Sequence, residues 1–267
     1  MDPIIQVVSI CLLFGALIGF LAGLLGIGGG LIAVPALLSI LPLVGFSHGF
    51  LPHVAIATSL AAIILTGLSS AISHQKRDNI PWFLFKPMLP GFVMGSLCAG
   101  FISEKISAGA LQQIFAVFVL LMAVKMAFPF KAESQRKLPH FLVLLMTAIV
   151  ISIIAALLGI GGSVLLVPFL TFFGIQMRYA IGFSAASGLL IASFGSVGYV
   201  LAGWDVHGLP QFTLGYIYIP ALLGIVSTSV LIAPLGAKAA STWRTDILKR
   251  LFALLLVIIG LKLVLVG

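Results

Sequence analysis

Two glycine-rich segments have the residue types and spacing best suited to holding a ligand in this chain. GLLGIGGGLIAVPALL spans Gly23–Leu38, and ALLGIGGSVLLVPFLT spans Ala156–Thr171. In both, closely spaced glycines precede a short apolar run that contains a proline. Glycines interrupt a helix, and the first N–H groups of the next helix lack intrahelical partners and carry a partial positive charge. Inside an apolar environment, a bound anion would satisfy these groups.

The two segments match each other about half a chain apart. Gly29 corresponds to Gly162, a spacing of 133 residues in a chain of 267. The next position is Gly30 in the first copy but Ser163 in the second, which makes the two copies chemically unequal. Repetition at this spacing predicts two copies of one structural unit.

Hydroxyl side chains recur at matching positions after the two segments. Ala55-Ile56 with Ser59 aligns with Ala180-Ile181 with Ser184, and Thr58 precedes Ser59. We predict that an anion lies between the two glycine breaks, held by backbone N–H groups and these hydroxyls. The predicted site residues are Gly28, Gly29, Gly30, Thr58, Ser59, Gly161, Gly162, Ser163 and Ser184.

A purely structural interpretation of the glycine segments stays open, in which they form tight turns or a close helix crossing. A nucleotide-binding loop is disfavoured, because the first segment lacks the last glycine of GxGxxG and the Lys-Ser/Thr of a P-loop. No catalytic triad, carboxylate pair or His/Cys metal cluster falls inside an apolar run. We therefore expect neither an enzyme, nor a metal, nor a cofactor.

Composition places these segments in a membrane protein. The chain is 61% hydrophobic and 7% charged, whereas soluble domains carry about 25% charged residues. The fold class is therefore an all-α polytopic membrane protein, in which the lipid bilayer is a partner and nucleic acid is not. The two cysteines, Cys11 and Cys98, lie in apolar runs and are expected to be unpaired.

Ten apolar runs divide equally between the halves, and the second run of each half is too short to span a bilayer. These short runs follow the glycine segments and are predicted to be broken or re-entrant helices. We expect a first membrane repeat over 1–130, a cytoplasmic linker over 131–138 and a second repeat over 139–267. The runs are 4–25, 31–43, 54–74, 87–103, 109–129, 139–159, 163–174, 179–202, 214–235 and 246–266.

Charge in the loops predicts the orientation. Lys76 and Arg77 follow the third run, whereas AGWDVHGLPQ, after the eighth run, has no Lys or Arg. Because basic loops stay in the cytoplasm, opposite charge at equivalent loops indicates that the second repeat inserts upside down. Every acidic residue lies in a loop or at the end of a run, so no carboxylate is expected near a bound anion.

Other polar groups in the apolar runs have ordinary structural explanations. Lys125 and Lys262 match each other near helix ends, where long side chains extend towards the interface. His53 and His74 lie at the two ends of the third run, as interfacial residues or as a pH-sensitive gate. Serines deeper in the runs are expected to bond to the backbone: Ser69, Ser70, Ser193 and Ser196.

The duplicated GLLGIGGG…VP and ALLGIGGS…VP motifs resemble those of the TauE/SafE family of sulfite and organosulfonate exporters. AIATSL, AIGFSAASG and AGWDVHGLPQFTLGYIYIPAL resemble that family too, so the resemblance extends from about Leu13 to Leu263. It implies a carrier for small sulfur-containing anions, sulfite or an organosulfonate, that exports them across the bacterial inner membrane. An anion channel, an uptake carrier of the same fold and a non-transporting membrane assembly subunit remain alternatives, and self-association is left open.

Overall fold

Each apolar run of the sequence folds as a helix in the computed structural model of the protein, which is mostly helical. The structure describes residues 3–25, 29–44, 46, 49–127, 138–242 and 245–266. The α-helices formed by the described residues are α1 (Pro3–Leu25), α2 (Gly30–Ile40), α3 (Leu51–Gln75), α4 (Phe85–Glu104), α5 (Ala108–Ala127), α6 (Phe141–Leu157), α7 (Ser163–Phe172), α8 (Met177–Ala202), α9 (Ile219–Thr242) and α10 (Thr245–Val266).

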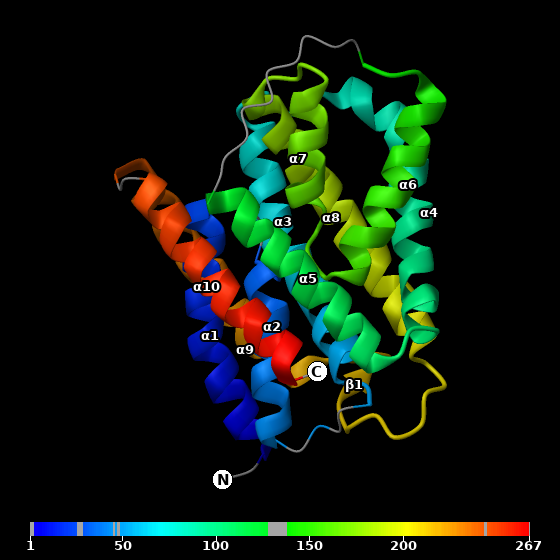
Figure 1. Cartoon of the computed structure of the whole chain (residues 1–267), viewed down its shortest axis with the longest axis vertical. Coiled ribbons are helices and arrows are strands. Elements are labelled where there is room, and N and C mark those ends of the chain that lie inside the picture. The colour runs from blue at the N-terminus through cyan, green and yellow to red at the C-terminus, as the bar shows by residue number, and fades with distance from the viewer. Residues whose placement is uncertain are drawn as a thin grey trace.

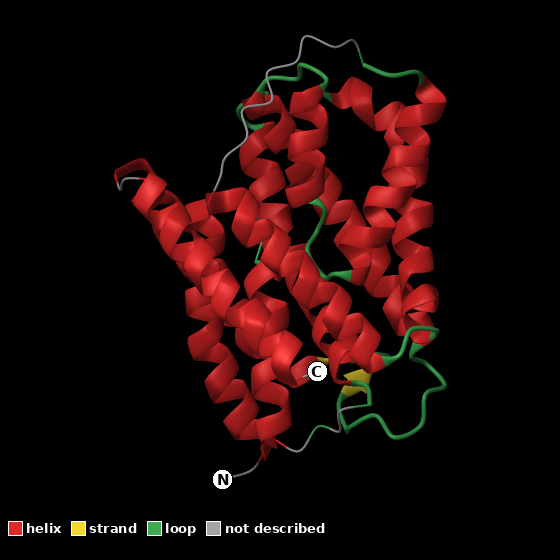
Figure 2. Cartoon of the chain, viewed as in Figure 1, coloured by secondary structure: helices red, strands yellow, loops and turns green. Residues whose placement is uncertain are grey.

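Most helices run between two opposite ends of the molecule (Figure 1). α1 begins and α10 ends at the lower end, whereas α5 ends and α6 begins at the upper end. The short helices α2 and α7 instead start at mid-height, and each returns to the end from which the preceding helix came. The short apolar runs therefore form helices that begin in the interior of the molecule, with the turn before α7 inside the helical bundle (Figure 2).

Helices α3 and α8 form the centre of the molecule. The apolar windows of both are 56% buried, compared with 28% for those of α1 and α5, which lie further out. α3 and α8 are antiparallel neighbours, so the start of α3 lies beside the end of α8. Any pathway between these two helices would be shielded from lipid by the surrounding helices.

Glycines allow the outer helices to pack closely. A Cβ atom at Gly91 of α4 would lie 2.7 Å from the Leu145 carbonyl oxygen of α6. A Cβ atom at Gly19 of α1 would overlap the Ser229 backbone of α9. α1 therefore packs along α9, and α4 packs along α6, as small residues at four-residue spacing permit.

A β-hairpin covers the lower ends of α3 and α8, at the start of the predicted apolar run 214–235. Strand β1 (Thr213–Leu214) pairs antiparallel with β2 (Ile217–Tyr218) through a turn in which Gly215 has a φ of +54°. The predicted apolar run from 214 therefore begins as a strand, and α9 starts only at Ile219. We call this end of the molecule the hairpin end.

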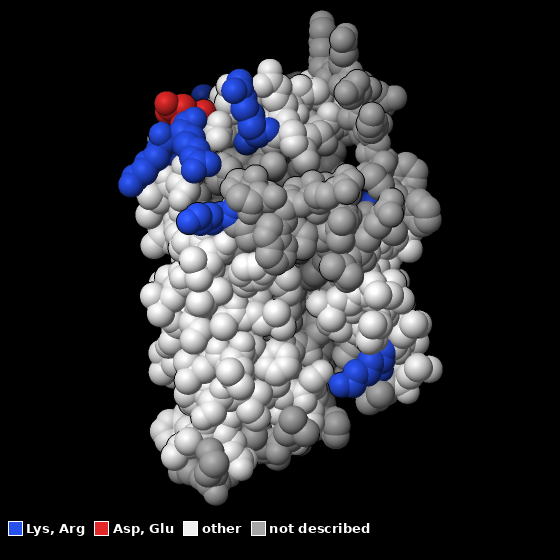
Figure 3. Space-filling model, turned by 90° about the vertical axis from the view of Figure 1, so that its left-hand side faces the viewer, with Lys and Arg blue, Asp and Glu red and all other residues white. Residues whose placement is uncertain are grey.

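Basic side chains gather at the opposite end, which we call the basic end. Figure 3 shows most of the Lys and Arg atoms at the top of the molecule and few near the bottom. The basic end contains the loops after α3 and α7, with Lys76, Arg77 and Arg178. Among the described residues, five helices are long and apolar enough to cross a membrane. The chain is thus an all-α, multi-pass membrane protein.

Candidate functional site

The second glycine segment forms a turn between α6 and α7 that only glycine adopts easily. α6 ends at Leu157, and Gly159, Gly161 and Gly162 have φ angles of +66°, +63° and +80°. Positive φ costs an L-residue about 1–2 kcal/mol, which explains the glycines. Gly162 is the N-cap of α7 and provides no side-chain hydrogen bond to the first turn, so that turn directs backbone N–H groups into the bundle.

The two glycine segments touch each other at the centre of the bundle. A Cβ atom at Gly30 would overlap the carbonyl oxygen of Gly159 and lie 2.8 Å from the Cα of Ile160. Ser59 Oγ donates a hydrogen bond of 2.9 Å to the same Gly159 oxygen. Both glycine segments and α3 therefore meet at one place in the structure.

A cavity of about 450 Å³ lies between α3, α8 and the glycine segments. It reaches from Ile160 and Gly161 at mid-height to His74 and Arg77 at the basic end. Four of the predicted site residues line it: Gly29, Gly161, Ser163 and Ser184. Other lining residues come from α1, α8 and α9: Ala22, Ile181, Ala185, Gly188, Val230, Ala233 and Pro234.

The other predicted residues contact protein atoms instead. Thr58 Oγ1 accepts a 3.0 Å hydrogen bond from the Tyr218 N–H of the hairpin. Ser59 bonds to Gly159, and Gly30 packs against the second glycine segment. A Cβ atom at Gly162 would lie 2.7 Å from Ile191 Cδ1. Gly28 lies outside the described residues.

The second half of α3 supplies cavity residues that the sequence analysis did not select. Its hydroxyls and charged groups form one stripe, because positions 66, 70, 73 and 77 are three or four residues apart and share a helix face. This spacing is a signal in the sequence, whereas each serine taken alone has an ordinary structural explanation. The cavity residues from this part of α3 are Ile63, Thr66, Gly67, Ser69, Ser70, Ser73 and His74, and Arg77 follows in the turn after the helix.

The cavity is suited to a small anion. Its described lining residues include no Asp or Glu, and Arg77 supplies a positive charge at the basic end. Ser184 is 1% exposed and donates a 3.2 Å hydrogen bond to the Ile181 carbonyl. Because this bond is long for a hydroxyl donor, the hydroxyl can readily donate to a bound anion instead. Hydroxyls and backbone N–H groups are neutral donors, which bind an anion without trapping it.

The two matching lysines hold the short helices. Lys125 Nζ donates to the Val164 carbonyl of α7 at 3.5 Å, and Lys262 Nζ donates to Ser39 Oγ of α2 at 3.3 Å. These contacts add a positional role to the interfacial one expected from the sequence. Each lysine connects the last helix of its half, α5 or α10, to a short helix.

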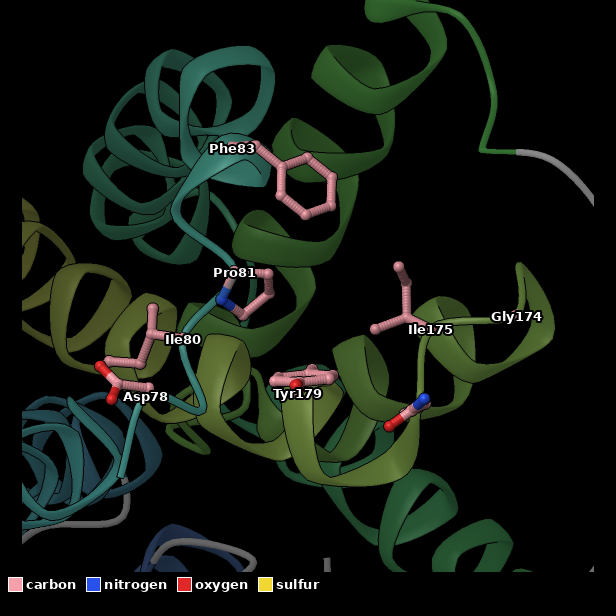
Figure 4. Close-up of a pocket in the computed structure, with 8 residues that line it drawn as sticks. Asp78, Ile80, Pro81, Phe83, Gly174, Ile175 and Tyr179 are labelled. Atoms are coloured by element: carbon pink, nitrogen blue, oxygen red, sulfur yellow. The ribbon is translucent and has the colours of Figure 1, made fainter. Parts of the chain in front are cut away.

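A second pocket, of about 400 Å³, lies at the basic end between the loops that follow α3 and α7. Figure 4 shows Pro81, Phe83, Ile175 and Tyr179 around its interior, with Asp78 at one side. Apolar walls and a carboxylate make this pocket a poor anion site. No group of His, Cys, Asp or Glu in the described part of the chain is arranged to hold a metal ion.

These features define the class of the protein as a multi-pass membrane protein with an internal cavity whose described lining residues include several hydroxyls and no Asp or Glu. The family model for "Sulfite exporter TauE/SafE" matches residues 11–263, and the chain belongs to this family.

Curated relatives agree over nearly full length. A probable membrane transporter protein of Haemophilus influenzae is 38% identical over 256 residues, covering 96% of this chain and 97% of the relative. The probable membrane transporter protein YunE of Bacillus subtilis is 24% identical, covering 97% of each chain. No solved structure matches. The chain is accordingly a membrane transporter of small molecules and not an enzyme.

Proposed function

We propose that this transporter is a secondary carrier that exports small sulfur-containing anions, sulfite or an organosulfonate, across the bacterial inner membrane. The observation that carries the proposal is the cavity itself. It joins both glycine segments to a stripe of hydroxyls and ends at Arg77, with no carboxylate among its described lining residues. The family description, sulfite exporter, supports the sulfur oxyanion and the direction.

The anion binds at the mid-height end of this cavity. The backbone of Gly29 and Gly161 and the hydroxyls of Ser163 and Ser184 surround it, and Arg77 attracts it at the entrance. Helix starts and unwound backbone form such sites in many carriers, because their partial charges bind an ion without a buried full charge. The basic end faces the cytoplasm by the positive-inside rule, so the cavity takes its cargo from the cytoplasm.

The carrier consists of two inverted repeats, 1–130 and 139–267, joined by a cytoplasmic linker over 131–138. The helix contacts support this arrangement. α1 packs along α9 as its counterpart α6 packs along α4, and α3 and α8 pack on each other as equivalent helices. If each helix is replaced by its counterpart in the other repeat, the same pairs of helices therefore remain in contact.

Flux of sulfite and of sulfoacetate in proteoliposomes tests the proposal. We expect saturable flux, which separates a carrier from a channel. Arg77→Gln should weaken the apparent affinity about fivefold, since one unit charge near a hydrated anion contributes roughly 1 kcal/mol. Lys76→Gln removes the same charge beside the cavity without touching its lining, and should change the affinity less than twofold. Absence of flux for any sulfur anion, or equal effects of both variants, would refute the proposal.

A further inference from the structure

The proposed inverted repeats pair some residues of the cavity wall with residues that are buried outside the cavity. Ser184 of α8 lines the cavity, while its counterpart Ser59 of α3 is 0% exposed. The same spacing of 125 residues pairs His74 with Tyr199. His74 lines the cavity, whereas Tyr199 is 0% exposed. Of these two counterparts, Ser59 lies against the second glycine segment and Tyr199 lies against the hairpin.

A cluster of buried polar side chains occupies this sealed region. His53 Nε2 donates to the Ser103 carbonyl oxygen at 2.9 Å, and the His53 ring stacks on Tyr216 at 5.3 Å. Tyr199 meets Tyr216 edge to face at 6.3 Å. Ser196 lies one turn before Tyr199 on α8. Residues from α3, α4, α8 and the hairpin therefore converge at one place.

Four polar atoms of this cluster make no well-formed hydrogen bond among the described residues, although the Tyr199 hydroxyl interacts with the Ser103 side chain. The atoms are His53 Nδ1, Ser103 Oγ, Ser196 Oγ and the Tyr199 hydroxyl, and each of the four residues is at most 5% exposed. A buried polar group without a partner costs about 1–3 kcal/mol, so a cluster of imperfectly paired groups is costly. The cost is understandable if the groups bind a polar ligand in another state of the protein.

The hairpin closes this cluster from the outside. Tyr216, at its turn, is 2% exposed and contacts both His53 and Tyr199. The Tyr218 N–H donates to Thr58 Oγ1, and the Tyr218 ring packs on Phe46 at 4.8 Å. Movement of the hairpin away from α3 would expose Thr58 and Ser59 together with the cluster.

Resting on the proposed function, we propose that Ser59, Ser103, Ser196 and Tyr199 form a second site for a small oxyanion, an exit site, which opens at the hairpin end when the central cavity closes. Tyr216 is its lid. His53 positions Ser103 through the Nε2 hydrogen bond. The hydroxyls supply neutral donors, as in the central cavity, so the anion passes between two similar environments. Thr58 and Ser59 thereby join the transport pathway in the outward-facing state.

Thiol labelling locates the exit site. Cysteine replaces Ser59 or Ser196 in a protein whose Cys11 and Cys98 are changed to alanine, and a membrane-impermeant maleimide is added to either side. We expect labelling of both positions from the hairpin side alone. Ser184→Cys should react from the basic side. Ser152→Cys is the matched control, since Ser152 is equally buried but lies in the α4–α6 contact, where it donates to the Gly91 carbonyl.

Two variants test the roles of Tyr216 and Tyr199. Tyr216→Ala should speed hairpin-side labelling at position 59 at least tenfold, while Trp204→Ala, which changes an exposed ring near the hairpin, should not. Tyr199→Phe removes only the buried hydroxyl. It should slow sulfite flux at least threefold, with sulfate binding to the central cavity unchanged. A merely structural Tyr199 would leave the flux unchanged.

The outcomes separate this proposal from the function on which it rests. The exit site would be overturned if cysteines at positions 59 and 196 react with the maleimide as little as a cysteine at position 152, or if they react from the basic side. This holds even if sulfite flux is saturable. Unchanged flux in Tyr199→Phe would overturn it as well. Labelling from the hairpin side without flux or binding of any sulfur anion would support the second opening and refute the proposed cargo.

Discussion

Replacing Ser184 by alanine tests whether the cavity hydroxyls bind the anion. Ser184 lines the cavity and donates to the Ile181 carbonyl at 3.2 Å. Ser193, further along α8, donates to the Leu189 carbonyl at 2.8 Å and does not line the cavity. Both alanine variants lose one hydrogen bond within α8, but only Ser184→Ala removes a donor from the anion site.

The size of the effect follows from the hydrogen bonds exchanged. A hydrogen bond to a charged partner is worth about 1.5–3 kcal/mol, and Ser184 gives up a neutral one worth about 0.5–1.5 kcal/mol to make it. The net contribution is about 1 kcal/mol, so Ser184→Ala should weaken sulfite binding about fivefold.

Ligand-dependent thermal stability measures this change in purified protein. Sulfite at 100 times its Kd stabilises the folded state by about 2.7 kcal/mol. At the same concentration, a fivefold weaker variant would gain only about 1.8 kcal/mol. Ser193→Ala should keep the full gain. Equal gains for the two variants would show that Ser184 does not contact the anion.

Three further predictions concern the glycine segments and the loops. Gly161→Ala and Gly208→Ala both place a side chain at positive φ, so each should lower the unfolding free energy by about 1–2 kcal/mol. A Cβ atom at Gly161 would lie 3.2 Å from Ile63 in the cavity wall, so only Gly161→Ala should also weaken sulfite binding in the same thermal assay. Gly30→Ser should abolish folded yield, while Ser163→Gly should fold and bind more weakly; normal yield for Gly30→Ser would contradict the observed crossing of the segments. Asp205→Asn should keep sulfite flux within twofold, and loss of flux in this variant would disprove transport without a carboxylate.

Much of the fold was predictable because a bilayer requires long, uninterrupted apolar helices. The apolar runs 54–74 and 87–103 became α3 and α4 with boundaries shifted by at most three residues. The hairpin was not predictable in this way. Its strands are two residues long, so they have no periodicity, and the apolar residues from 214 onwards continue directly into α9.

The candidate site was predictable only in part, because its residues are selected by tertiary contacts. Gly29 and Gly161, which the repetition of the glycine segments singles out, both line one cavity. The direction of the Ser59 hydroxyl depends on where Gly159 lies, which sequence spacing does not encode. The hydroxyl stripe of α3 is visible in the sequence only when its positions are viewed on one helix face rather than as single serines.

The unequal third position of the two glycine segments has a physical reason in their crossing. Gly30 faces the backbone of Gly159 and Ile160 so closely that no side chain fits between them. Its counterpart, Ser163, faces the open cavity, where a hydroxyl has room. A glycine at the first copy thus permits the close crossing, and a serine at the second copy adds a hydroxyl to the cavity wall. Under the proposed function, this difference between the copies combines close packing with a side-chain donor for the anion.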